Sequence, residues 1–184
     1  PFTSHNDARL LINGCEAFPA MFAGIEAANV YVIVQFYIIH DDNLGRQLRE
    51  LLERKARAGV RVYLLYDEIG SYQLPRAYRR SLAEAGVIVL PFRTSRGLRN
   101  RFQINFRNHR KIVVIDNAIT YCGSQNCADP EFRVKARFAP WVDVMVRFEG
   151  PIARQNQRLF AADWMSATDE NLDELLQARW RAPQ

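Results

Sequence analysis

The sequence has few cysteines, glycines and prolines, and it lacks the cysteine pattern of a small disulfide-bonded protein. It contains three cysteines, Cys15, Cys122 and Cys127, and no Cys-x-x-Cys pair. This odd count argues against a disulfide framework and against a four-ligand zinc site, and it indicates a reducing compartment. Nine glycines and eight prolines among 184 residues exclude a fibrous or low-complexity chain, and an apolar content of 48% excludes a disordered one.

Long apolar runs are also missing. The longest, Val30–Ile39, is interrupted by Gln35 and ends at His40, whereas a helix that crosses a bilayer needs about 20 apolar residues. No signal peptide precedes this run. The length predicts a single domain over residues 1–184. Because the first residue is Pro1 rather than Met, we expect the sequence to be part of a longer protein.

Strands alternate with helices in the first half of the chain, and strands predominate after it. Runs of apolar and β-branched residues predict strands at 9–13, 30–39, 60–66, 87–92, 111–116, 118–122 and 141–149. Helical spacing of apolar residues predicts helices at 16–29, from 41 or 42 to 59, 72–85, 152–164 and 171–180. This order indicates an α/β fold with a mixed, largely parallel central sheet flanked by helices.

The positive charge is concentrated in one segment. The chain carries 25 basic and 20 acidic residues, and seven of the basic ones lie between Arg93 and Lys111 with no acidic residue among them. Six of these seven are arginines, which bind phosphate oxygens in a bidentate manner. The segment is either a solvated loop or a platform for the phosphates of nucleic acid, phospholipid or a small phosphodiester.

One histidine begins a regularly spaced set of polar residues. The pattern is H-x-K-x4-D-x6-G-S-x-N, and its members are His109, Lys111, Asp116, Gly123, Ser124 and Asn126. His109 and Lys111 are two residues apart, so in a strand both side chains project from one face. An imidazole nitrogen is a nucleophile toward phosphorus near neutral pH, and a neighbouring ammonium stabilises the non-bridging oxygens of the phosphate.

The other positions fit the same phosphoryl chemistry. Ser124 and Asn126 can donate hydrogen bonds to the phosphate oxygens, and Gly123 allows backbone and phosphate to approach closely. Asp116 is counted among the catalytic residues, although before Asn117 it can also serve as the turn residue of a hairpin. Each residue taken alone has a structural explanation, but the spacing of the whole set favours a catalytic site. The acidic residues are scattered, so we expect a mechanism without metal or cofactor.

The pattern resembles the HKD signature of the phospholipase D superfamily. The stretches NHRKIVVIDNAITYCGSQNCADPEF and PWVDVMVRFEGPIARQNQRLFAADW resemble the first catalytic half of bacterial cardiolipin synthases, as do the upstream stretches NGCEAFPAMFAGIEAA and AGVIVLPF. The resemblance covers the chain from about Arg9 to Trp164. It implies a phospholipase D-like α-β-α sandwich, with residues 165–184 as a terminal helix or a linker to a second half.

The resemblance implies a phosphatidyltransferase that acts on an anionic phospholipid, phosphatidylglycerol. His109 would attack the phosphodiester and form a phosphohistidine, while Lys111, Ser124 and Asn126 would hold the phosphate oxygens. Asp143, in the stretch PWVD, matches the acidic residue that in this family accepts a hydrogen bond from the nucleophilic imidazole. The protein would be bacterial and associated with the cytoplasmic membrane through an anchor outside this sequence.

The sequence departs from the family because it holds one copy of the signature. Cardiolipin synthases carry two, and the second histidine protonates the departing glycerol, but His40 has no lysine two residues later. Either a second half lies outside this sequence, or two copies of the chain pair, as in compact nucleases of the superfamily. Two other functions stay open: a homodimeric, metal-independent phosphodiesterase or nuclease, and a non-catalytic module that binds anionic membrane surfaces.

Overall fold

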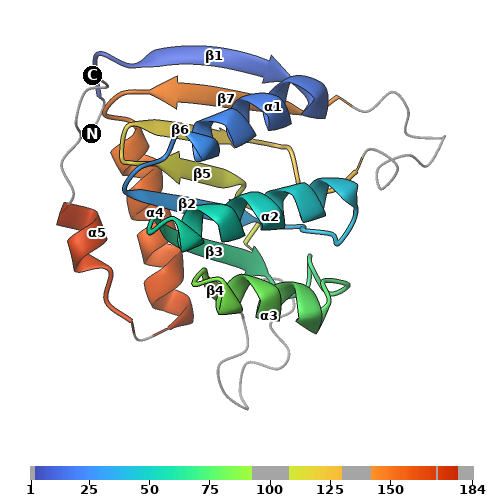
Figure 1. Cartoon of the computed structure of the whole chain (residues 1–184). Helices are drawn as coiled ribbons and strands as arrows, with labels where there is room; N and C mark the ends of the chain where they lie inside the picture. The colour runs from blue at the N-terminus through green and yellow to red at the C-terminus, as the bar shows by residue number, and fades with distance from the viewer. Residues whose placement is uncertain (1–2, 93–107, 130–141, 169, 178–184) are drawn as a thin grey trace, which may run out of the picture.

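The computed structural model describes residues 3–92, 108–129, 142–168 and 170–177. Within these ranges, seven strands form one sheet in the order β1-β7-β6-β5-β2-β3-β4 (Figure 1). The strands are β1 (Asp7–Ile12), β2 (Tyr31–Phe36), β3 (Arg61–Asp67), β4 (Ile88–Phe92), β5 (Ile112–Ile115), β6 (Ile119–Gly123) and β7 (Val144–Glu149).

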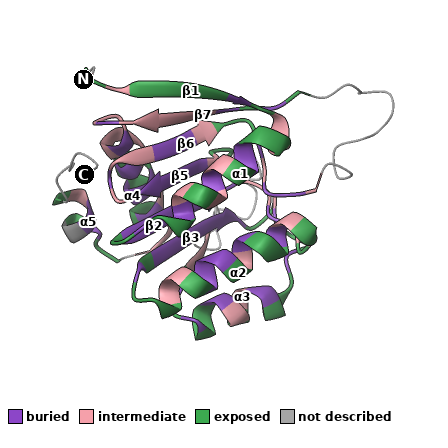
Figure 2. Cartoon of the chain, turned by 45° about the horizontal axis from the view of Figure 1, so that its top comes forward, coloured by how far each residue is buried: buried purple, intermediate pink, exposed green. Residues whose placement is uncertain are grey.

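Helices cover both faces of this sheet. They are α1 (Asn13–Glu26), α2 (Asn43–Arg57), α3 (Arg76–Glu84), α4 (Ala153–Ala167) and α5 (Asp173–Gln177). α1, α2 and α3 lie on one face, and α4 lies on the other with α5 beside it (Figure 1). In β2, Val32 and Val34 belong to the core under α1–α3, whereas Tyr31 and Ile33 belong to the core under α4. The central strands are therefore buried on both sides (Figure 2), and the expected α-β-α sandwich is confirmed.

Parallel pairing is confined to three strands. β2, β3 and β4 pair in parallel because the crossover helices α2 and α3 connect them, and the other four neighbouring pairs are antiparallel. The prediction of a mixed sheet is confirmed, but the prediction that it is largely parallel is wrong. The alternation of strands and helices ends at β4, and β5 and β6 instead form a hairpin. Asp116 and Asn117 turn that hairpin with positive φ angles of 50° and 55°.

Two predicted helices have different ends in the structure. α3 begins at Arg76 rather than Tyr72, because Pro75 is its extended N-cap residue and a proline disfavours helical backbone in the residue before it. α4 continues past Trp164 to Ala167, so residues 165–167 do not belong to the terminal helix. The described part of that terminal helix is the short α5.

Some sequence features lie outside the described residues. They are residues 93–107, which hold five of the seven clustered cations, and residues 130–141, which precede Asp143. Of the basic segment, the structure therefore describes Arg110 and Lys111. Among the described helices, none combines the length and the apolar composition that a membrane span requires.

Candidate active site

Residues from three separate segments meet at one edge of the sheet. β5 runs antiparallel to both β2 and β6, and β7 runs antiparallel to β6, so the carboxyl ends of β2 and β6 lie beside the amino ends of β5 and β7. His109 and Lys111 precede β5, Ser124 and Asn126 follow β6, and Asp143 precedes β7. The strand order thus places these five predicted residues at the same edge.

The side chain of His109 is exposed and stacks on the ring of Tyr37, the first residue after β2. The two ring centroids are 4.0 Å apart and the planes are inclined by 27°. The Nζ atom of Lys111 lies 5.3 Å from the centre of the same Tyr37 ring and donates a hydrogen bond of 2.6 Å to the His109 carbonyl oxygen. Tyr37 therefore holds the imidazole and the ammonium beside each other. Sequence reasoning missed this residue because it closes an apolar run.

Asp143 is a buried carboxylate that connects to two other site residues. Its Oδ1 accepts a hydrogen bond of 2.6 Å from Ser124 Oγ, and Val144 N donates to the same Oγ at 3.0 Å. Burial lowers the pKa of Lys111, and the negative charge of Asp143 opposes that lowering. Asn13 fixes the Asp143 backbone with two hydrogen bonds. Its backbone N–H donates to the Asp143 carbonyl oxygen at 2.8 Å, and its side-chain Oδ1 accepts from the Asp143 backbone N–H at 3.0 Å. The Ser124 hydroxyl proton thus points at Asp143.

Asn126 is oriented by the segment that follows β2. Its Oδ1 accepts a hydrogen bond of 3.1 Å from Ile38 N. Cys127 N donates to Ile38 O at 3.1 Å, and His40 N donates to Cys127 O at 3.1 Å, so the two segments form a short parallel bridge. Because the Asn126 oxygen is used in this bond, its amide nitrogen is the donor that it can offer to a phosphate.

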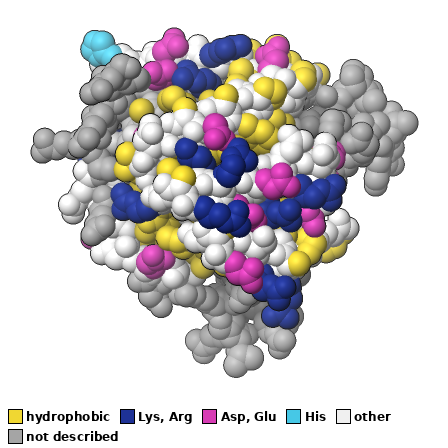
Figure 3. All heavy atoms as spheres, in the orientation of Figure 1, with side chains coloured by type: hydrophobic (Ala, Val, Ile, Leu, Met, Phe, Trp, Pro, Cys, Tyr) yellow, Lys and Arg dark blue, Asp and Glu magenta, His cyan; other side chains and the backbone are white. Residues whose placement is uncertain are grey.

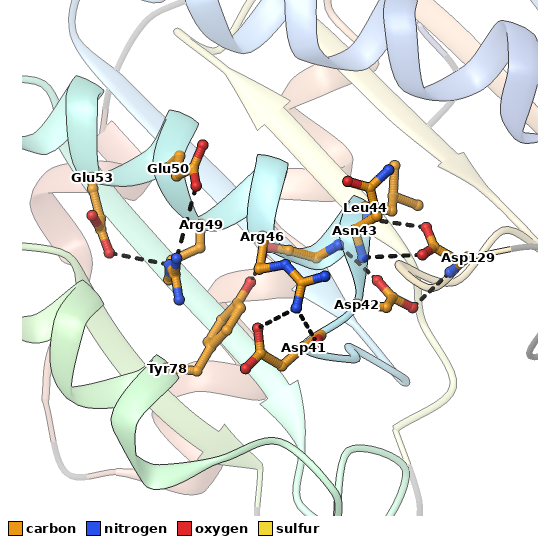
Figure 4. A network of polar contacts seen from close by, with 11 residues as sticks. Asp41, Asp42, Asn43, Leu44, Arg46, Arg49, Glu50, Glu53, Tyr78 and Asp129 are labelled. Atoms are coloured by element: carbon orange, nitrogen blue, oxygen red, sulfur yellow. Dashed lines mark hydrogen bonds and ion pairs between the residues drawn. The ribbon is translucent and has the colours of Figure 1, made fainter.

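Two aspartates attach the segment after β6 to the start of α2 (Figure 4). Asp42 caps the helix by accepting from Gly45 N at 2.9 Å, and its other oxygen accepts from Asp129 N at 2.7 Å. The Asp129 carboxylate in turn accepts from Asn43 N and Leu44 N, each at 3.0 Å. Negative charge is favourable at a helix amino end, so this exchange fixes the position of the chain just beyond Asn126.

Gly123 lies at the end of β6, where it pairs with Met145 of β7. A Cβ atom there would lie 2.1 Å from the Val144 carbonyl oxygen and 2.8 Å from the Met145 Cα. The space that glycine leaves free is therefore occupied by β7. The close approach predicted between Gly123 and phosphate is, in the structure, a close approach between two strands.

Asp116 lies at the opposite end of β5 from His109. Its carboxylate accepts three backbone hydrogen bonds, from Asn29 N (2.8 Å), Val30 N (2.9 Å) and Tyr31 N (2.8 Å). These bonds join the β5–β6 turn to the start of β2. One strand length separates this carboxylate from the end of the sheet that holds His109, so the geometry favours the turn role of Asp116 over a catalytic one.

A polar network fixes the residues on either side of His109. Asp163, on α4, accepts hydrogen bonds from Asn108 Nδ2 (2.6 Å), from Gln35 Nε2 (2.8 Å) and from Arg110, whose NH1 lies 2.7 Å from both carboxylate oxygens. Arg110 thus forms an ion pair with Asp163 within the protein, although 45% of its side chain is exposed. Asn108 and Arg110 adjoin His109 in the sequence, but nothing in the sequence relates Asp163 to them.

A resident metal has no evident ligand set in the part of the chain that the structure describes. Within these ranges, no group of three or more histidine, cysteine, aspartate or glutamate side chains is placed to hold a metal ion. At this end of the sheet, the groups that can bind a phosphate are the ammonium of Lys111, the hydroxyl of Ser124 and the carboxamide of Asn126.

A family comparison identifies the fold. The model of the family described as "Cardiolipin synthase, PLD-like domain" matches residues 21–164. The chain belongs to this family. Among curated members, Cardiolipin synthase A of Pseudomonas putida strain F1 is 48% identical over 168 residues, which are 91% of this chain and 35% of that protein. Cardiolipin synthase A of Pseudomonas fluorescens strain SBW25 is 48% identical over 92% of this chain and 36% of its own length. The chain spans about a third of the length of these relatives.

Solved structures outside the close relatives share the fold of this PLD-like domain. Nuc from Salmonella typhimurium, a phospholipase D family member, matches with a TM-score of 0.63 and 17% identity over 91% of this chain and 99% of its own. NucT from Helicobacter pylori matches with a TM-score of 0.66 and 16% identity over 89% of this chain and 99% of its own. The phospholipase D-like architecture predicted from the sequence is confirmed.

Proposed function

We propose that this chain is the first catalytic half of a phospholipase D-type phosphatidyltransferase that makes cardiolipin from phosphatidylglycerol. The observation that carries the proposal is the placement of His109 and Lys111 on the Tyr37 ring, at the sheet edge that also holds Ser124 and Asn126. An exposed imidazole at the same end of the sheet as an ammonium, a hydroxyl and a carboxamide suits attack on a phosphodiester. The 48% identity to cardiolipin synthases supports the choice of substrate class.

In the first step, a His109 ring nitrogen attacks the phosphorus of one phosphatidylglycerol. The bond between phosphorus and the oxygen of the glycerol head group breaks, and free glycerol leaves with a proton from a second acid. The phosphatidyl group stays on the imidazole as a phosphohistidine. Lys111 and Asn126 donate to the non-bridging oxygens, on which negative charge increases in the transition state.

Ser124 and Asp143 have linked roles in this proposal. In the structure the Ser124 hydroxyl donates to Asp143, so binding of a phosphate oxygen requires that hydroxyl to turn. Asp143 is then available to accept a hydrogen bond from the His109 imidazole and to fix its tautomer, which leaves the other nitrogen free to attack. This bond stays a prediction.

In the second step, the terminal hydroxyl of a second phosphatidylglycerol attacks the phosphohistidine. The phosphorus–nitrogen bond breaks, the hydroxyl proton passes to a base, and cardiolipin is released. Each cycle converts two phosphatidylglycerols into one cardiolipin and one glycerol. The acid and base of these steps belong to a second signature histidine, on a further segment of the same protein or on a second copy of the chain. The complete enzyme works at an anionic membrane surface.

The test uses a chimera in which this chain replaces the matching segment of the Pseudomonas putida relative, hereafter the assembled enzyme. We expect it to convert phosphatidylglycerol into cardiolipin, as followed by thin-layer chromatography, and we expect His109→Ala to abolish the product. His5→Asn is the matched control, because His5 precedes β1 at the edge of the sheet away from the site and asparagine tolerates its positive φ of 60°. Cardiolipin formation by the His109→Ala enzyme at the normal rate would refute the proposal.

A homodimeric phosphodiesterase or nuclease is the second candidate, because the sequence carries a single signature. It predicts that the isolated chain cleaves plasmid DNA or a small phosphodiester in the presence of EDTA, with a rate that follows the dimer population. An inactive isolated chain that gains transferase activity in the assembled enzyme favours the phosphatidyltransferase.

A further inference from the structure

The residues on either side of His109 form hydrogen bonds with helix α4, which covers the face of the sheet opposite α1–α3. Asp163 belongs to α4, and its carboxylate is largely buried, with 13% of the side chain exposed. It accepts from Gln35 on β2 and from Asn108 and Arg110, the two residues that adjoin His109. One carboxylate therefore connects β2, α4 and both neighbours of the nucleophile.

The backbone on the amino side of His109 is fixed as well. Asn108 N donates to Asp67 Oδ2 at the end of β3, at 3.1 Å. Arg110 N donates to Asn108 Oδ1 at 3.1 Å, which closes a tight loop around His109. With both neighbours held, the backbone of His109 is fixed at the position from which its exposed imidazole stacks on the Tyr37 ring.

We propose that Asp163 is a positioning residue for the nucleophile: it holds Asn108 and Arg110 so that His109 stands in line with the phosphate. The inference rests on the proposed function above. Asparagine at position 163 would keep the size of the side chain but would lose the charge and turn an NH2 group toward donors. The loop would then lose its common anchor. Displacement of a reacting group by about 1 Å can lower a rate about 100-fold.

A purely structural carboxylate would affect stability without this specific loss, so a matched control is needed. Glu53 provides it on α2, across the sheet from α4, on a face where acidic and basic side chains are interspersed (Figure 3). Its side chain is 10% exposed, it lies within 3.6 Å of Arg49 and 3.4 Å of Arg57, and it accepts from Ser81 Oγ at 2.6 Å (Figure 4 shows Glu53 with Arg49). Glu53→Gln therefore removes a comparably buried, arginine-paired charge that touches no residue of the site.

The experiment measures kcat and KM for phosphatidylglycerol in the assembled enzyme, at a temperature well below the melting point of each variant. We expect Asp163→Asn to lower kcat about 10- to 100-fold while KM changes less than threefold. Glu53→Gln should lose a similar amount of thermal stability and keep kcat within twofold of the parent. Arg110→Gln, which changes a half-exposed residue, should lower kcat about fivefold, and adding it to Asp163→Asn should lower kcat no further, because both act through one contact.

Three results would overturn the inference. The first is a kcat within twofold of the parent for Asp163→Asn, or for Arg110→Gln if Asp163→Asn does not fold. The second is an equal loss of kcat in Glu53→Gln, which would attribute the effect to stability. The third is full additivity of the two substitutions. Each of these leaves the proposed function intact if His109→Ala is inactive, whereas an active His109→Ala enzyme refutes the proposed function and this inference together.

Discussion

The close approach of β7 to Gly123 predicts that one added methyl group lowers the stability of the fold by a large amount. In Gly123→Ala the new Cβ would lie 2.1 Å from the Val144 carbonyl oxygen, 2.8 Å from Met145 Cα and 2.9 Å from Met145 Sδ. Two of these neighbours are backbone atoms of a strand that is paired on both sides, by β6 and by β1. They cannot turn away as a flexible side chain would. β6 and β7 must therefore separate by about 1 Å where Ser124 N donates to Val144 O at 2.8 Å.

The expected magnitude follows from these contacts. Overpacking costs about 1–3 kcal/mol, and loss of the adjoining backbone hydrogen bond adds about 1 kcal/mol. A total of about 3 kcal/mol corresponds to a fall in melting temperature of about 6–12 °C for a domain of this size. Circular dichroism during heating measures it. The control is Gly14→Ala in α1, where the new Cβ would meet side-chain atoms rather than backbone, the ring of Phe18 at 3.2 Å and Gln125 Nε2 at an ordinary 3.6 Å. A fall below about 2 °C for Gly123→Ala, or an equal fall in both variants, would refute this reasoning.

Two further predictions concern buried ionisable groups. Lys111→Met should raise the melting temperature at neutral pH while abolishing transfer, because burial lowers the pKa of Lys111 and the folded state therefore holds its ammonium at a cost. That advantage should shrink as the pH rises from the lowered pKa toward the ordinary value of 10.5, where the unfolded chain loses the same proton; an advantage that grows with pH would contradict it. Iodoacetamide applied to the folded protein should modify the exposed Cys15 and spare Cys127, which is fully buried and whose pKa burial raises. Peptide mass spectrometry measures both sites, and rapid labelling of Cys127 would show that this core opens.

The signature and its hairpin could be predicted from sequence because they are local. The polar pattern from His109 to Asn126 spans one strand, a tight turn and a second strand, so the antiparallel pairing itself brings both ends to one edge. The start of α2 is also local: the sequence predicts it at 41 or 42, and the structure selects Asp42 as the capping residue.

The parts that escaped prediction depend on distant segments. No local pattern indicates that β1 joins β7, or that antiparallel pairs outnumber parallel ones, because strand order is settled by packing. The role of Asp163 depends on α4 crossing beneath β5, and that of Tyr37 on the register between β2 and β5. The sequence leaves Asp116 between a catalytic role and a turn role, and its bonds to the start of β2 are visible only in three dimensions.

The position of β1 at the edge of the sheet has a consequence for synthesis on the ribosome. Among the strands that the structure describes, β1 pairs only with β7, and β7 follows it by well over half of the chain. At translation speeds of about 5–20 residues per second, the first strand waits roughly 7–30 seconds for its partner to be made. Closing so long a loop also slows refolding, because its entropy must be lost before any contact compensates. We therefore expect β1 to dock only after β7 has been made, and a nascent chain stopped before β7 to expose Leu11, which is fully buried in the folded protein, to chaperones.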